Sequence, residues 1–186
     1  MKTLFKIMLV PAAVLTAGLP ARADNKAEAM AAIKGFGGDL KKTLQSAMKK
    51  DGPAGAIGAC RIEAGPIAAK HGAGKWTVGR TSLKVRNPAN APDQWELKVL
   101  NMFEEKRAAG VSAGKLAHGE VVDRGGRKVY RFMKAIPTAG LCLNCHGTDL
   151  KPAVTAKLDE LYPNDKARGF KAGDIRGAFT LEKPLK

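Results

Sequence analysis

The chain has 186 residues, of which 45% are hydrophobic and 26% are charged, so its composition is that of one ordinary globular domain and excludes a disordered tail or a collagen-like fibre. Lys and Arg number 32 against 17 Asp and Glu, and the net charge of +15 fits nucleic acid, anionic lipid or an acidic protein as a partner. The chain has only 2 Trp, 2 Tyr and 6 Phe, so a large apolar cofactor would help to fill its core.

The first 23 residues are typical of a secretory signal peptide. Two lysines precede an apolar stretch from Ile7 to Leu19, and Ala21-Arg22-Ala23 places small residues where signal peptidase accepts them. We expect cleavage after Ala23, a periplasmic location and a mature domain spanning residues 24–186. The apolar stretch is too short to span a bilayer and no longer one follows, so we expect no stable membrane insertion after cleavage. Export argues against nucleic acid as a partner.

Residues 24–70 are predicted to form a helical segment. Apolar side chains recur at helical spacing from Asn25 to Lys50, and the glycines in this stretch predict a break near Gly37. After Asp51-Gly52-Pro53, a second apolar stripe places Cys60 on the inward face of a helix. The stripe consists of Ile57, Cys60, Ala64 and Ile67. Considered by its pattern alone, Cys60 is a small buried hydrophobe.

Residues 71–186 are predicted to hold an antiparallel sheet together with the remaining helices. Trp76 to Arg86 alternates as a strand, with Arg80, Ser82, Lys84 and Arg86 on its polar face and Thr81, Leu83 and Val85 on the other. Asp93 and Glu96 form a capping box that begins a helix, and Gly110 ends this helix. Its inward side chains are Trp95, Val99, Met102 and Phe103.

A hairpin and a last strand complete the predicted sheet. Glu120–Asp123 and Lys128–Met133 read as strands around a glycine-rich turn. A short helix contains Val154, Leu158 and Leu161 and stops before Pro163. Asp174–Leu181 alternates as a final strand with Ile175, Phe179 and Leu181 on one side. These elements describe an α+β fold with an antiparallel sheet.

The motif Cys142-Leu143-Asn144-Cys145-His146 is the C-x-x-C-H attachment pattern of c-type haem. Two thiols three positions apart can reach the two vinyl groups of one porphyrin, and the next residue then offers its imidazole to the iron. Cys142 and Cys145 are therefore candidate thioether anchors, and His146 is the candidate axial ligand of one covalent haem. A thioredoxin-like redox pair would need a βαβ context, and a zinc site would need further ligands at matching spacing.

Several segments in the same order resemble a family of c-type haem domains catalogued as a domain of unknown function. The segments are Ile57-Gly58-Ala59-Cys60, Val78–Pro88, Ala91-Pro92-Asp93, Met133-Lys134, Cys142–Gly147 and Gly173–Phe179. The resemblance covers nearly all of the mature chain and implies a PAS-like sheet with flanking helices. It also implies that His146 is one axial ligand of the iron and that an upstream helical cysteine, here Cys60, is the other.

The sequence alone also allows other side chains as the distal ligand of the iron. His71 and His118 lie in polar, glycine-rich contexts typical of surface residues. Methionines at apolar positions more often fill core gaps, although a His/Met haem is the commoner electron carrier. These methionines are Met30, Met48, Met102 and Met133. The basic strand face around Arg80 is a candidate contact for the haem propionates.

Two functions follow as hypotheses. The first is a redox or small-ligand sensor, in which loss of the Cys60 bond on reduction opens the iron to a diatomic gas. The second is a periplasmic electron-transfer cytochrome, whose basic surface docks an acidic redox partner. We expect no enzyme activity, because no nucleophile, carboxylate pair or phosphate loop stands out.

Overall fold

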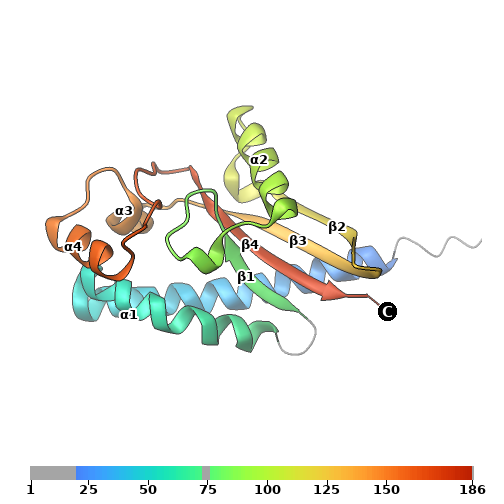
Figure 1. Cartoon of the computed structure of the whole chain (residues 1–186), viewed down its shortest axis with the longest axis horizontal. Helices are drawn as coiled ribbons and strands as arrows, with labels where there is room; N and C mark the ends of the chain where they lie inside the picture. The colour runs from blue at the N-terminus through green and yellow to red at the C-terminus, as the bar shows by residue number, and fades with distance from the viewer. Residues whose placement is uncertain (1–19, 73–75, 186) are drawn as a thin grey trace, which may run out of the picture.

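The computed structural model describes residues 20–72 and 76–185, and it consists of a four-stranded antiparallel sheet with helices on both faces (Figure 1). The strands are β1 (Thr77–Thr81), β2 (Ala117–Arg124), β3 (Arg127–Pro137) and β4 (Ile175–Pro184), in the order β1-β4-β3-β2. The helices are α1 (Pro20–Gly72), α2 (Gln94–Ala108), α3 (Gly140–His146) and α4 (Pro152–Leu161), with short 3-10 turns η1 (Pro88–Asn90) and η2 (Ala113–Lys115). The α+β fold is thereby confirmed.

The predicted signal peptide lies largely in residues 1–19, outside the described residues. Its last residues, 20–23, form the start of α1. In the described part of the chain, none of the helices combines the length and the apolar character that a membrane span requires.

The two faces of the sheet each have their own core. Residues of α1 pack on one face against Trp76, Tyr130, Phe132 and Leu181. Residues of α2 pack on the opposite face against Met133, Ala135 and Ala178. Figure 1 shows α1 along one side of the sheet and α2 on the other. Because neighbouring side chains of a strand point to opposite faces, the alternating sequence of β3 supplies both cores.

α1 is two helices that meet at Gly52, whose φ of 67° and ψ of −174° are not helical. The predicted break near Gly37 is wrong, because the helix continues through that region. The glycines there make room for rings: a Cβ on Gly35 would lie 2.5 Å from the His71 ring, and one on Gly37 would lie 3.0 Å from the Phe179 ring. They are therefore positions of close packing.

One carboxylate in the middle of the first helix contacts the far end of the second helix. Asp39 accepts hydrogen bonds from Lys70 at 3.0 Å and pairs with His71 Nε2 at 2.9 Å. These contacts, led by the His71 hydrogen bond, lower the pKa of Asp39 to about 2. The second helix, residues 53–72, is thus held by the Gly52 connection at one end and by Asp39 at the other.

Substituting alanine for either of two glycines of α1 should have opposite effects on stability. Gly35→Ala should lower the free energy of unfolding by about 1–3 kcal/mol, because the new methyl group must displace the His71 ring. Gly38→Ala is the matched control on the same helix, since nothing lies within 4 Å of its Cβ, and it should raise stability by about 0.5–1 kcal/mol. Thermal unfolding measures both. Equal shifts of the unfolding temperature in the two variants would contradict the close packing of the helices.

The remaining elements match the expectations in part. The capping box is present, with Asp93 accepting from the Glu96 backbone at 2.8 Å and Glu96 accepting from Asp93 at 3.1 Å. β2 and β3 form the predicted hairpin, but both strands are longer than predicted. Gly125 and Gly126 form its turn with φ values of 63° and 81°, which suit glycine.

Two strand predictions are wrong in detail. β1 ends at Thr81, so the predicted alternation through Arg86 does not hold, and Leu83 is exposed instead of buried. In β4, a register shift opposite Pro137 separates Ile175 from Phe179 and Leu181. Ile175 therefore joins the core on the α2 face, whereas Phe179 and Leu181 face α1.

Candidate functional site

A cavity of about 560 Å³ lies among the second helix of α1, β1, the segment that follows β1, α3 and the start of β4. Its volume is typical of a small-molecule or cofactor site. Much of its wall is apolar, with side chains that include Phe36, Leu44, Ile57, Val78, Ile136 and Leu141. Cys60, Cys142, Cys145 and His146 all lie in this wall. The structure therefore brings together the two predicted haem anchors and the two predicted axial ligands.

The C-x-x-C-H motif forms α3, a short helix after the sheet strand β3. Three residues are a little less than one helical turn, so Cys142 and Cys145 lie on the same side of α3, and His146 follows at its last position. None of the three cysteines forms a disulfide. In the described part of the chain, no three His, Cys, Asp or Glu side chains are grouped as ligands of one metal ion.

His146 is neutral and held in one orientation. Because the acceptor is a carbonyl, Nδ1 carries the proton and donates to Ala167 O at 2.7 Å. Nε2 therefore has the lone pair, and it accepts a hydrogen bond from Arg176 Nε at 3.2 Å. Burial, together with the charges of Arg176 and Arg86, lowers the pKa of His146 to about 3. This protonation state is the one that a metal ligand needs.

Cys60 comes to the cavity from a distant part of the sequence, on the second helix of α1. Its side chain is half-buried in the cavity wall and does not lie in a packed core. Burial raises the pKa of Cys60, while the charges of Arg80 and Arg86 oppose this shift. Burial also raises the pKa of Cys145. Both sulfurs are therefore uncharged thiols in the chain itself.

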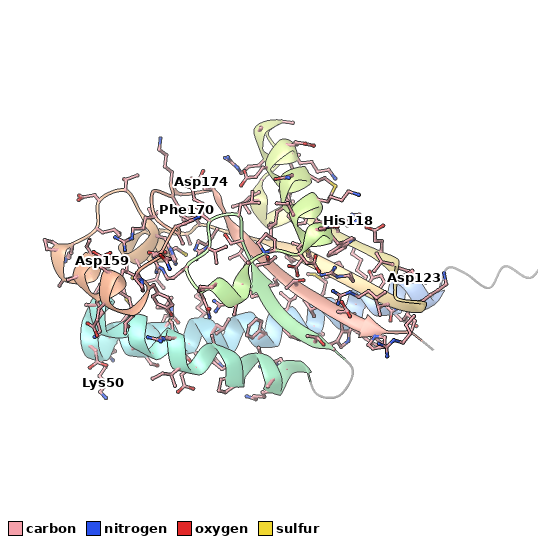
Figure 2. All side chains as sticks on the ribbon, in the orientation of Figure 1. Lys50, His118, Asp123, Asp159, Phe170 and Asp174 are labelled. Carbon is pink, nitrogen blue, oxygen red and sulfur yellow. The ribbon has the colours of Figure 1, made fainter. Side chains whose placement is uncertain are left out.

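The polar part of the wall is cationic. Four arginines line the cavity, and among its described lining residues there is no Asp or Glu. The arginines are Arg61, Arg80, Arg86 and Arg176. The polar strand face predicts Arg80 and Arg86 at a haem contact, but nothing in the sequence predicts a role for Arg176, which alternates with inward residues at the start of β4. Lys84 was also predicted there, but it is not part of the cavity wall. Its ammonium group lies 5.1 Å from the centre of the Phe170 ring, a residue labelled in Figure 2.

Arg86 ties α3 to the segment that orients His146. It donates to Cys145 O at 2.6 Å and forms an ion pair with Asp165 at 3.1 Å. Asp165 also accepts from the Ala167 backbone N–H at 2.9 Å, and the carbonyl of Ala167 holds the His146 ring. Burial raises the pKa of Asp165, but the hydrogen bonds from Arg86, Ala167 and Arg168 outweigh it, so the pKa lies below its usual value.

Asp165→Asn should lower the free energy of unfolding by about 3 kcal/mol or more, because it leaves the Arg86 charge buried without its partner. The Asp165 side chain is 0% exposed. Since its folded-state pKa is depressed, its contribution is present above the unfolded-state pKa and is lost as pH falls through the folded-state value. The variant should therefore lose less stability than the parent on acidification, as chemical denaturation at several pH values would show.

Asp159→Asn is the matched control for this prediction. Asp159 on α4 forms an ion pair with Arg168 at 2.6 Å, but its side chain is 62% exposed (Figure 2). Exposed pairs contribute less than about 1 kcal/mol. If both variants lost the same small amount of stability, the assigned role of Asp165 would be wrong.

Of the other candidate distal ligands, the structure brings only Met48 into the cavity wall. His71 is paired with Asp39, and His118 contacts Glu120 at 3.1 Å beside α2 (Figure 2). The remaining methionines lie in the two sheet cores, with Met30 on the α1 face and Met102 and Met133 on the α2 face. Among the candidates, Cys60 and Met48 are therefore the sulfur side chains placed to act as the distal ligand.

Comparisons with known proteins give one family and one structure. The family model described as Tll0287-like matches residues 21–184. The crystal structure of the cyanobacterial heme-protein Tll0287 is similar to this chain with a TM-score of 0.61 and 24% sequence identity, and the match covers 91% of this chain and 98% of that one. No curated protein sequence matches the chain. The structural match is a likeness of fold.

Proposed function

The chain belongs to the Tll0287-like family, and from this premise we propose that it is a periplasmic protein that carries one covalent c-type haem. Cys142 and Cys145 would hold the porphyrin by thioether bonds, and His146 and Cys60 would be the axial ligands of the iron. The observation that carries the proposal is that Cys60 and α3, far apart in sequence, line one cavity. The structurally similar protein is described as a cyanobacterial heme-protein, which also supports it.

The residues present fit such a group. The cavity has a largely apolar wall for a porphyrin ring, two thiols on one side of α3 and a neutral imidazole with its lone pair on Nε2. For Nε2 to bind iron, Arg176 must give up its hydrogen bond to this atom. Arg176 keeps two other acceptors, Ser82 Oγ at 3.2 Å and Lys84 O at 3.4 Å.

The proposed role is that of a redox or small-ligand sensor and not of an enzyme. The haem would supply a one-electron couple and an iron that can take a diatomic gas. The chain would supply a helix, residues 53–72, whose position depends on whether Cys60 is bound. This helix contacts α4, since Ile57 packs against Val154 and Leu158. A shift at Cys60 would therefore reach the outer surface of α4, where a signalling protein could detect it.

Electron transfer is the second candidate function, and the excess of Lys and Arg over Asp and Glu favours it. A basic surface steers an acidic redox protein into contact and accelerates its association. In either role the partner would be a protein and not a nucleic acid. The chain would not insert into a membrane after signal cleavage.

Absorption spectra of the exported protein, oxidised and reduced, test the proposal directly. We expect a c-type haem spectrum with thiolate features in the oxidised protein. A sensor should lose these features on reduction and bind carbon monoxide. If the reduced protein kept thiolate ligation and refused carbon monoxide, the sensor role would fail, and rapid reduction by an acidic partner would favour the electron carrier.

A further inference from the structure

We infer that the cavity is selective for a ligand with two carboxylates and that Arg80 is the residue that binds one of them. This inference rests on the proposed haem function and deepens it, because it assigns the specificity of the site to a residue outside the attachment motif. It concerns how the chain recognises the edge of the porphyrin that is remote from the thioether bonds.

The first argument is the charge of the wall. Four guanidinium groups and no carboxylate line the cavity among the described residues. Arg61 is exposed and lies over the Tyr162 ring at 5.8 Å, so it belongs to the cavity mouth. Three arginines then remain inside, and burial lowers the pKa of two of them, Arg80 and Arg176. Placing like charges together in a buried site is unfavourable unless an anion joins them.

The second argument is that the partners of these arginines differ. Arg86 has a carboxylate of its own, Asp165, and Arg176 donates to Ser82 Oγ and to Lys84 O. The guanidinium group of Arg80, on β1, makes no hydrogen bond or ion pair with any other described residue, although the residue is half-buried in the wall. Guanidinium groups bind carboxylates through two parallel hydrogen bonds. Arg80 is therefore the side chain whose donors are ready for a ligand.

The third argument is charge balance. Asp165 cancels one of the three inner arginines, which leaves two positive charges. A ferric porphyrin ring carries one positive charge, and a Cys60 thiolate would cancel it. The two carboxylates of the porphyrin would then match the two remaining arginine charges. A diester of the same porphyrin would leave these charges buried without a counter-charge, so the cavity should discriminate against it.

The test uses the haem-free full chain and two probes, ferric mesoporphyrin IX and its dimethyl ester. Their ethyl groups cannot form thioether bonds, so absorption titration reports reversible binding. The wild-type chain should bind the diacid about tenfold or more tightly than the diester, the expected size for hydrogen bonds to charged groups. Arg80→Gln should weaken diacid binding about tenfold and should not weaken diester binding, because it also removes a charge that the diester leaves without a counter-charge. Lys84→Gln is the control from the neighbouring segment, and it should change neither affinity.

Two results would overturn the inference while the haem proposal stands: equal binding of both probes by the wild-type chain, or wild-type diacid affinity in Arg80→Gln. The first comparison needs no variant, so it decides the matter even if Arg80→Gln does not fold. If the wild-type chain bound neither probe, this inference would fail, whereas the proposed haem function would still be decided by the mass of the exported protein.

Discussion

Replacing Cys142 and Cys145 together with alanine is expected to abolish covalent attachment of haem. Both thiols lie on one side of α3 in the wall of the cavity, so they can reach one porphyrin together. Without them, any haem in the site is held only by axial bonds and packing, and acidified organic solvent should extract all of it. Mass spectrometry of protein exported by a host that matures c-type cytochromes measures the outcome. The double variant should show the bare polypeptide mass.

Cys60→Ala is the control for this result, because its sulfur is not an attachment point and its haem should stay covalent. Each single variant, Cys142→Ala or Cys145→Ala, should retain one thioether bond. If the wild-type protein from the same host also showed the bare polypeptide mass, the C-x-x-C-H motif would have no role in haem attachment and the proposed function would be lost.

Cys60→Ala itself should have the second large effect, on the reduction potential of the iron. A thiolate neutralises the ferric haem, whereas reduction would leave a negative charge in a site of low dielectric constant. Removing the thiolate should favour the reduced state by several kcal/mol, and about 1.4 kcal/mol corresponds to about 59 mV for one electron. We therefore expect the potential to rise by roughly a few hundred millivolts and the thiolate absorption features to disappear.

Met48→Leu is the matched control, because Met48 is the other sulfur side chain among the distal candidates that lines the cavity. Its substitution should leave both the spectrum and the potential close to those of the wild type. The opposite pattern, with a changed spectrum in Met48→Leu and an unchanged one in Cys60→Ala, would identify Met48 as the distal ligand. Cys60 would then be a packing residue.

The features that could be predicted are those fixed by neighbours in sequence. The capping box of Asp93 and Glu96, the Gly125-Gly126 turn and the C-x-x-C-H motif each depend on a few adjacent residues, and each is present in the structure. The inward face of Cys60 was also correctly predicted from helical spacing. The resemblance to a family of haem domains is confirmed by the match of the Tll0287-like family model. The iron ligands remain a prediction.

The features that could not be predicted depend on contacts between distant segments. Gly35 and Gly37 read as helix breakers because the rings that they accommodate come from His71 and Phe179. The strand pairs with β4 as far as Thr81, and at the next residue the side chain makes the contact with β4, because Ser82 Oγ donates to Arg176 O at 2.9 Å. Arg176 itself carries no local signal of its place beside His146. In each case the deciding partner is more than thirty residues away or on another element.

The attachment of residues 53–72 at both ends limits how this helix can respond. The Gly52 connection holds one end and Asp39 holds the other through Lys70 and His71. A helix held in this way is restrained at both ends, so we expect a movement at Cys60 to be a small turn of the segment between them. Such a turn would carry Ile62, which is 70% exposed, across the surface while the ends stay in place. A change at the proposed haem iron would then alter which side chains of residues 53–72 are exposed to a partner, without moving the ends of the helix.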